Sequence, residues 1–95
     1  MESDGFEWDD DKAAQNLAAH AISFETAARA FDDAFAIEWQ DERERYDEDR
    51  FIRLGMVDER ILFVVFSLRN GRTRIISARG TEPREKRKYY AENTQ

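Results

Sequence analysis

The chain has 95 residues, a length typical of one domain with a single hydrophobic core, so we expect residues 1–95 to form one domain. It is 41% hydrophobic and 13% aromatic and has no cysteine, which argues against disorder and excludes disulfides and thiolate chemistry. The net charge of −6 hides a split: residues 1–49 carry 16 acidic and 4 basic side chains, and residues 50–95 carry 5 and 11. The basic half either binds an anionic partner or is simply offset by the acidic half.

The N-terminal half predicts a short strand followed by two helices, after a loose tail at residues 1–5. Residues 6–8 are the short strand candidate. Residues 9–22 predict a helix that begins at Asp9 or Asp10 and has a narrow apolar face formed by Ala14, Leu17, Ala18 and Ala21. Ser23 is expected to cap a second helix, with an apolar face formed by Phe24, Ala27, Ala28 and Phe31.

The C-terminal half predicts four strands and a last helix. The strand candidates are residues 34–39, 50–57, 60–68 and 72–78, with a charged loop at 40–49. The strand at 60–68 is apolar on both faces, which is typical of a central strand covered on each side. Thr81 or Glu82 is expected to cap the last helix, and Pro83 suits its first turn. The predicted fold is therefore α+β, a small antiparallel sheet with two N-terminal helices and a C-terminal helix.

Asn70-Gly71 is the pair favoured in a two-residue type I′ hairpin, so the last two strands are expected to pair antiparallel around it. That register places Val64 opposite Ser77 and Leu62 opposite Arg79. It also puts Ser77 and Arg79 on the face of Ile75. Asp58-Glu59 is not a favoured turn pair, which leaves the register of the strand at 50–57 open, and with it the question of whether Arg50 or Arg53 shares a face with Arg79.

Several groups of polar residues could carry chemistry, and each also has a structural interpretation. Lys12, Asn16 and His20 form one helical stripe that suits proton transfer or phosphate binding, or is a surface stripe whose histidine caps the helix. Ser77 and Arg79 suit phosphate binding or a salt bridge at the sheet rim. Residues 84–90 interleave basic and aromatic side chains, as in a nucleic-acid surface or in a helix that packs its tyrosines. Glu85 could orient an arginine or act as a base.

The chain has no glycine-rich phosphate loop, no paired-histidine metal spacing and no serine-hydrolase motif. Any chemistry would depend on Arg, Lys, His and Glu side chains. Such a set, without metal or cofactor, suits RNA transphosphorylation, because the 2′-hydroxyl of the RNA is itself the nucleophile. With no apolar run longer than residues 61–66 and no signal-peptide pattern, we expect a cytoplasmic protein without a membrane segment.

Four segments together carry a family pattern. They are FEWDDDKAAQNLAAHAISFETAARAFDD, YDEDRFIRLG, LFVVFSLRNGRTRIISARG and EKRKY. From about Phe6 to Tyr90 the chain resembles the BrnT family, toxins of bacterial type II toxin–antitoxin systems. It departs from the family pattern at Ala19 and Ala21, where lysine and glycine usually flank the histidine, and at Thr81 and Lys86.

The resemblance implies a RelE-like fold and an endoribonuclease that slows translation and growth. It also implies a BrnA-like antitoxin that neutralises the toxin and through which the complex binds operator DNA. On the matched positions, the residues expected to act in catalysis are His20 in proton transfer, Lys12, Arg50 and Arg79 on the phosphate, Ser77 as a hydrogen-bond donor to it, and Glu85 in orienting the site. The expected RNA-binding residues are Arg53, Arg74, Arg84, Arg87, Lys88 and Tyr89. The alternative is a module without catalysis, a co-repressor or degenerate toxin that only binds the antitoxin.

Overall fold

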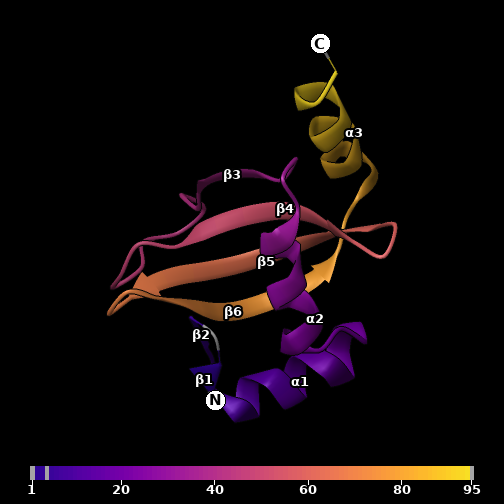
Figure 1. Cartoon of the computed structure of the whole chain (residues 1–95). Coiled ribbons are helices and arrows are strands. Elements are labelled where there is room, and N and C mark those ends of the chain that lie inside the picture. The colour runs from indigo at the N-terminus through magenta and orange to yellow at the C-terminus, as the bar shows by residue number, and fades with distance from the viewer. Residues whose placement is uncertain (1, 4, 95) are drawn as a thin grey trace.

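The computed structural model describes residues 2–3 and 5–94 and shows an α+β architecture (Figure 1). Its strands are β1 (Glu2–Ser3), β2 (Phe6–Glu7), β3 (Ile37–Gln40), β4 (Phe51–Val57), β5 (Arg60–Arg69) and β6 (Arg72–Gly80). Its helices are α1 (Asp10–His20), α2 (Phe24–Ala28), a short 3-10 turn at Arg29–Asp32, and α3 (Pro83–Glu92). The predicted order is confirmed: a short strand (β2), two helices (α1 and α2), four strands (β3 to β6) and a C-terminal helix (α3).

The sheet is mixed, which corrects the expectation of a purely antiparallel one. Its order is β1-β2-β6-β5-β4-β3, with β3 to β6 paired antiparallel in sequence order. At the other edge β2 pairs parallel to β6 through Phe6–Thr73 and Glu7–Arg74, because α1 and the following chain separate these strands by a crossover rather than a hairpin. Part of the expected loose tail is also paired, since Glu2–Ser3 runs antiparallel to Phe6–Glu7, while Met1 and Asp4 lie outside the described residues.

The two faces of the sheet carry two separate apolar clusters. On one face α2 and the 3-10 turn contribute Phe24, Ala27 and Ala30, which pack on strand residues such as Val64 and Ile75. The other face is formed by Ile52, Leu54, Ile61, Phe63 and Val65, with Tyr89 from α3 packed on them. The central strand β5 is therefore covered on both faces, as its apolar sequence predicts. None of the described helices is long and apolar enough to cross a membrane.

Local side-chain chemistry places the helix ends where the sequence predicts. Asp9 caps α1 by accepting from Lys12 N, and Ser23 caps α2 by accepting from Thr26 N. Glu82 precedes Pro83 and forms a reciprocal capping box with Glu85 at the start of α3. These caps explain where each of the three helices begins.

The predicted apolar face of α1 is wrong. Leu17 is 52% exposed, and Asn16 is the buried residue of this helix, with 7% exposure. The Asn16 carboxamide donates to Ala78 O at 2.8 Å and to Ile22 O at 3.0 Å, and accepts from Ala78 N at 3.0 Å. Helix α1 therefore docks on β6 through hydrogen bonds, and a buried amide takes the place that an apolar side chain was expected to fill.

The pairing of β5 with β6 contains a bulge that corrects the predicted register. Asn70 and Gly71 have positive φ angles of 52° and 77° and form the expected tight turn, and Phe66 lies opposite Ile75. Ile76 is then an extra residue, so that Val65 lies opposite Ser77 and Phe63 opposite Arg79. Ser77 and Arg79 consequently lie on the face of Phe63 and α3, opposite to the face of Ile75 on which we expected them.

The turn between β4 and β5 settles the register that the sequence left open. Asp58 and Glu59 have φ angles of 49° and 67° and form a two-residue turn with Val57 opposite Arg60. In this register Arg53 lies opposite Val64, on the face covered by α2. Arg53 therefore does not share a face with Arg79.

Candidate functional site

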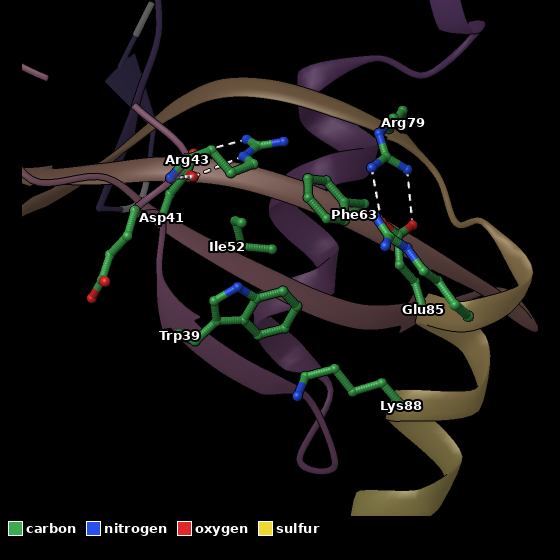
Figure 2. Close-up of a pocket in the computed structure, with 10 residues that line it drawn as sticks. Trp39, Asp41, Arg43, Ile52, Phe63, Arg79, Glu85 and Lys88 are labelled. Atoms are coloured by element: carbon green, nitrogen blue, oxygen red, sulfur yellow. Dashed lines mark hydrogen bonds and ion pairs between the residues drawn. The ribbon is translucent and has the colours of Figure 1, made fainter. Parts of the chain in front are cut away.

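A hollow of about 340 Å³ lies between the sheet and α3, on the face of Phe63 (Figure 2). Its apolar lining comes from three strands, with Trp39 on β3, Ile52 on β4 and Phe63 on β5. Charged side chains surround this apolar surface: Asp41, Glu42, Arg43, Arg79, Arg84, Glu85 and Lys88. Four are cationic and three acidic, so the lining is net positive in a chain whose net charge is −6.

Arg79 and Glu85 form the central pair of the hollow. The Arg79 Nη1 and Nη2 atoms donate to the two Glu85 carboxylate oxygens at 2.9 Å each, and Nη1 also donates to Gly80 O. The guanidinium carbon lies 3.8 Å from the Phe63 ring centroid, so the planar group is stacked on the aromatic face. The carboxylate and the ring therefore hold the guanidinium in one orientation.

One edge of the Arg79 guanidinium is left open. Of its five N–H groups, Nε–H and the second hydrogen of Nη2 have no hydrogen-bond acceptor among residues 2–3 and 5–94. These two donors point in the same direction and form a fork that matches two oxygens of a phosphate. The side chain is 29% exposed and lines the hollow.

Helix α3 supplies Glu85 in its ionised form. Burial alone would raise the pKa of Glu85, but hydrogen bonds from Arg79 and from Glu82 N, with the nearby positive charge, hold that pKa below its ordinary value. A carboxylate with a lowered pKa is a poor proton acceptor at neutral pH. Of the two roles that the sequence left open for Glu85, the geometry supports orienting Arg79 and does not support that of a base.

A second fixed ion pair lies on the loop after β3. Asp41 accepts from Arg43 Nε and Nη2 at 2.8 Å each, and from Tyr46 Oη at 3.1 Å. The hydrogen bonds from Arg43 outweigh burial and lower the pKa of Asp41 to about 2. Arg43 also lies over the Phe63 ring, 5.5 Å from its centroid, on a ring that Arg79 shares. The hollow is thus flanked by two guanidinium groups, each held by a buried carboxylate.

Lys12, His20 and Ser77 meet at a separate hollow of about 280 Å³ between α1 and β6. Asn16 also lines it and hydrogen-bonds to Ala78, the residue between Ser77 and Arg79. Ser77 and Arg79 are two residues apart on one face of β6, about 7 Å by the rise of a strand. The two hollows therefore open on neighbouring parts of the same strand.

The structure does not bring Arg50 to Arg79. Arg50 lies over the Tyr46 ring at 4.2 Å, in a neighbouring hollow that shares Asp41 and Glu42 with the first. Its buried Nε atom has no hydrogen-bond partner among the described residues. The expected catalytic set is accordingly spread over three hollows.

The expected RNA-binding residues divide into two groups. Arg53 donates to Ala30 O and Asp33 O and pairs with Glu38, and Arg74 pairs with Glu7 at 2.9 Å. Tyr89 donates to Asp33 Oδ2 at 2.6 Å, and burial together with this hydrogen bond raises its pKa to about 12. These three residues stabilise the fold. Arg84, Arg87 and Lys88 are exposed on α3, as a role in binding requires.

One comparison with known proteins decides the family. The family model described as "Ribonuclease toxin, BrnT, of type II toxin-antitoxin system" matches residues 8–85, which is most of the chain. The chain belongs to the BrnT family. No curated protein matches it at a significant level. The membership makes it a ribonuclease toxin of a type II toxin–antitoxin system, a class whose partner is a protein antitoxin.

The BrnT match includes Lys12, His20, Arg79 and Glu85 and ends at the first turn of α3. Lys88 and the rest of α3 are therefore features that the match does not describe. Sequence reasoning also missed Trp39 and Arg43 in the hollow. The alternation of β3 could have placed Trp39 beside Ile52, but only once the pairing of β3 with β4 was known.

Proposed function

We propose that this BrnT family member is an endoribonuclease that cleaves RNA without a metal ion and binds the scissile phosphate at Arg79. The observation that carries the proposal is the open Nε–Nη2 edge of a guanidinium that Glu85 and Phe63 hold in place. A donor pair fixed before the substrate arrives needs no reorganisation when negative charge develops on a phosphorane. Arg84 and Lys88, exposed at the same hollow, would neutralise neighbouring phosphates.

In this reaction the 2′-hydroxyl attacks the adjacent phosphorus, the bond to the 5′-oxygen breaks, and the products are a 2′,3′-cyclic phosphate and a 5′-hydroxyl. His20 is the proposed proton-transfer group, because an imidazole can both accept and donate a proton and His20 lines the hollow beside Ser77. Ser77 would donate a hydrogen bond to the phosphate, and Lys12 would offset its charge. The RNA would run along β6 from the Lys12–His20 hollow to the Arg79 hollow.

The finer features of the system are also proposals. We infer a RelE-like fold, action in the bacterial cytoplasm, and inhibition of translation and growth through RNA cleavage. The protein antitoxin would be BrnA-like, and the complex would reach operator DNA only through it.

The direct test is incubation of purified protein with RNA in excess EDTA. Wild-type protein should cut the RNA, and Arg79→Ala should lower the rate about 100- to 1,000-fold, the usual effect of removing one donor to a developing anion. Arg69→Ala is the matched control, because Arg69 pairs with Glu48 at the hairpin end of β5 and its loss removes the same charge. Intact RNA with wild-type protein in EDTA, or equal cutting by Arg79→Ala, would contradict the proposal.

Glu85→Gln tests the assignment of an orienting role. The amide keeps the size of the side chain but offers Arg79 one acceptor instead of two, so cleavage should fall while its pH dependence stays that of wild type. His20→Ala should lower the cleavage rate about 100- to 10,000-fold, the range for removal of a positioned proton-transfer group. Growth arrest on expression that disappears in the Arg79→Ala strain separates an enzyme from a module that only binds the antitoxin.

A further inference from the structure

We propose that the indole of Trp39 is a stacking surface for a nucleobase of the RNA, next to the phosphate bound by Arg79. The inference rests on the proposed function and assigns a base-binding subsite to the same hollow. Trp39 is half-buried on β3, and its ring packs edge-on against Phe63, with centroids 6.5 Å apart and planes at 77°. Figure 2 shows the indole between Phe63 and Lys88, with the Arg79–Glu85 pair beyond Phe63.

Trp39 is available for stacking, unlike the other aromatic ring of the lining. Phe63 is buried, and its face is covered by the Arg79 guanidinium at 3.8 Å. Among the described residues, the cation over the Trp39 ring is the Lys88 ammonium, 5.2 Å from its centroid. Lys88 is an exposed side chain on a flexible stem, so a base can displace it and leave its charge beside the RNA backbone.

The tyrosines that the sequence suggested for stacking do not line this hollow. Tyr89 is 4% exposed, and its hydroxyl is bound to Asp33. Tyr90 is 54% exposed and packs edge-on against Tyr89 outside the hollow. A base next to a phosphate at Arg79 would therefore stack on Trp39 of β3 and not on a tyrosine of α3.

The charges and the aromatic surface of the lining together suit a ligand that is both anionic and aromatic. Asp41 is paired with Arg43, and Glu85 with Arg79. The remaining lining charges are the cations Arg84 and Lys88 and the acidic Glu42, a net charge of +1 that can attract an anion, although Arg84 also lies 3.7 Å from the exposed Glu82. An aromatic surface, exposed cations and about 340 Å³ of space suit a nucleotide, since every base has a π-face and every phosphate a charge. Because stacking is tolerant of base identity, the subsite should add affinity without a strict sequence preference.

The two tryptophans of the chain allow a direct measurement. Trp8 is 5% exposed and belongs to the cluster on the opposite face of the sheet, so the Trp8→Phe variant leaves Trp39 as the only indole. The probe is a short RNA with 2′-O-methyl riboses, which lacks the internal nucleophile and stays intact. We expect saturable quenching of Trp39 fluorescence as this RNA is added. If the Trp8→Phe variant does not fold, wild-type protein gives the same signal over a constant background from buried Trp8.

A comparison of two probes isolates the stacked base. Trp39→Leu should weaken binding of the intact probe about 5- to 150-fold, the range for one base on an aromatic ring, and Trp39→Phe should retain most of the affinity. Tyr90→Leu is the matched control and should bind as wild type does. With a probe that carries abasic sites, wild-type protein and Trp39→Leu should bind equally, because the partner of the indole is then missing.

The outcomes separate this inference from the proposed function. The stacking subsite is overturned if RNA does not quench Trp39 fluorescence, or if Trp39→Leu weakens binding of both probes equally. If Arg79→Ala abolishes cleavage in that case, the ribonuclease assignment still stands. If Trp39 is quenched and the abasic probe removes the difference while no RNA is cut, the subsite stands and the cleavage proposal fails. Circular dichroism of each variant shows whether lost binding is due to unfolding. In addition, the intact and abasic probes can be compared on Trp8→Phe protein, in which Trp39 itself is unchanged.

Discussion

Replacing Asn16 with alanine should destabilise the protein far more than its place on a surface helix suggests. The carboxamide is 7% exposed and makes three hydrogen bonds, two of them with the backbone N–H and C=O of Ala78. Within residues 2–3 and 5–94, strand β2 pairs with β6 at Thr73 and Arg74 alone, so at Ala78 the amide occupies the place of a neighbouring strand. Without it, the outer edge of β6 loses its partner at the residue between Ser77 and Arg79.

The magnitude follows from these contacts. Each hydrogen bond contributes about 1 kcal/mol net, and backbone groups left unpaired in a buried site add to the loss. We expect the free energy of unfolding to fall by about 3 kcal/mol, with a small compensation from the better helix propensity of alanine. For a domain of this size such a loss lowers the Tm by roughly 15 °C. Urea unfolding followed by circular dichroism measures it, and amide hydrogen exchange should accelerate at Ala78.

Gln15→Ala is the matched control, because it removes an exposed amide from the same helix and should stay within about 0.5 kcal/mol of wild type. Asn16→Asp tests the geometry more finely. It keeps an acceptor for Ala78 N but turns a carboxylate toward Ala78 O and Ile22 O, so it should destabilise at neutral pH at least as much as alanine does. Equal stability of Asn16→Ala and Gln15→Ala would refute the account of Asn16 as the link between α1 and β6.

Three further predictions concern stability. The pKa of Asp41 in the folded protein is about 2, against an ordinary 3.8, so its contribution to stability is present above about pH 4 and is lost as the pH falls toward 2. Asp41→Asn should therefore lower the free energy of unfolding by about 1–2 kcal/mol at pH 7 and by little at pH 2, as measured by urea unfolding at both pH values. Gly55→Ala should cost about 1–3 kcal/mol, since a Cβ would meet Ala30 O at 2.5 Å. Glu59→Gly should stabilise the protein by about 1 kcal/mol, because the turn holds this residue at a φ of 67°.

Controls for these variants come from the same structure. Gly80→Ala places a Cβ near the end of the flexible Arg60 side chain instead of backbone, and should be far milder than Gly55→Ala. Gly5→Ala creates no clash, but it meets a φ of 89° and tests conformational strain separately from crowding. A loss for Asp41→Asn that is the same at both pH values would show that the carboxylate charge is not what stabilises the loop.

The features that the sequence predicted well depend on neighbouring residues. Asp9 and Ser23 cap their helices because a short polar side chain reaches the backbone N–H three positions ahead, and Glu82 does so through its capping box with Glu85. Asn70-Gly71 makes its turn because both residues tolerate a positive φ. Helix caps and tight turns depend on interactions within a few residues, so the local sequence predicts them directly.

The features that could not be predicted depend on contacts between distant segments. Asn16 reads as a polar surface residue until its partner, Ala78, is known to lie beside it. Asp58 occupies an unfavourable turn conformation that the antiparallel pairing and its ion pair with Arg29 hold in place. The residue types at the site were predicted, since Arg79, Glu85 and Lys88 do line one hollow, but Trp39 enters it only through the pairing of β3 with β4.

The bulge at Ile76 decides what Arg79 can do. With the regular register, Arg79 would lie opposite Leu62 and point into the cluster formed by Phe24 and its neighbours, where a guanidinium would be buried without a carboxylate. The extra residue reverses the faces of everything after it, so that the same side chain stacks on Phe63 and meets Glu85 of the α3 capping box. A regular strand would keep the β5–β6 pairing unbroken but would remove Arg79 from the hollow. The irregularity is therefore the step at which the fold gives Arg79 access to the hollow, and the reason that the hairpin turn alone predicted the wrong face.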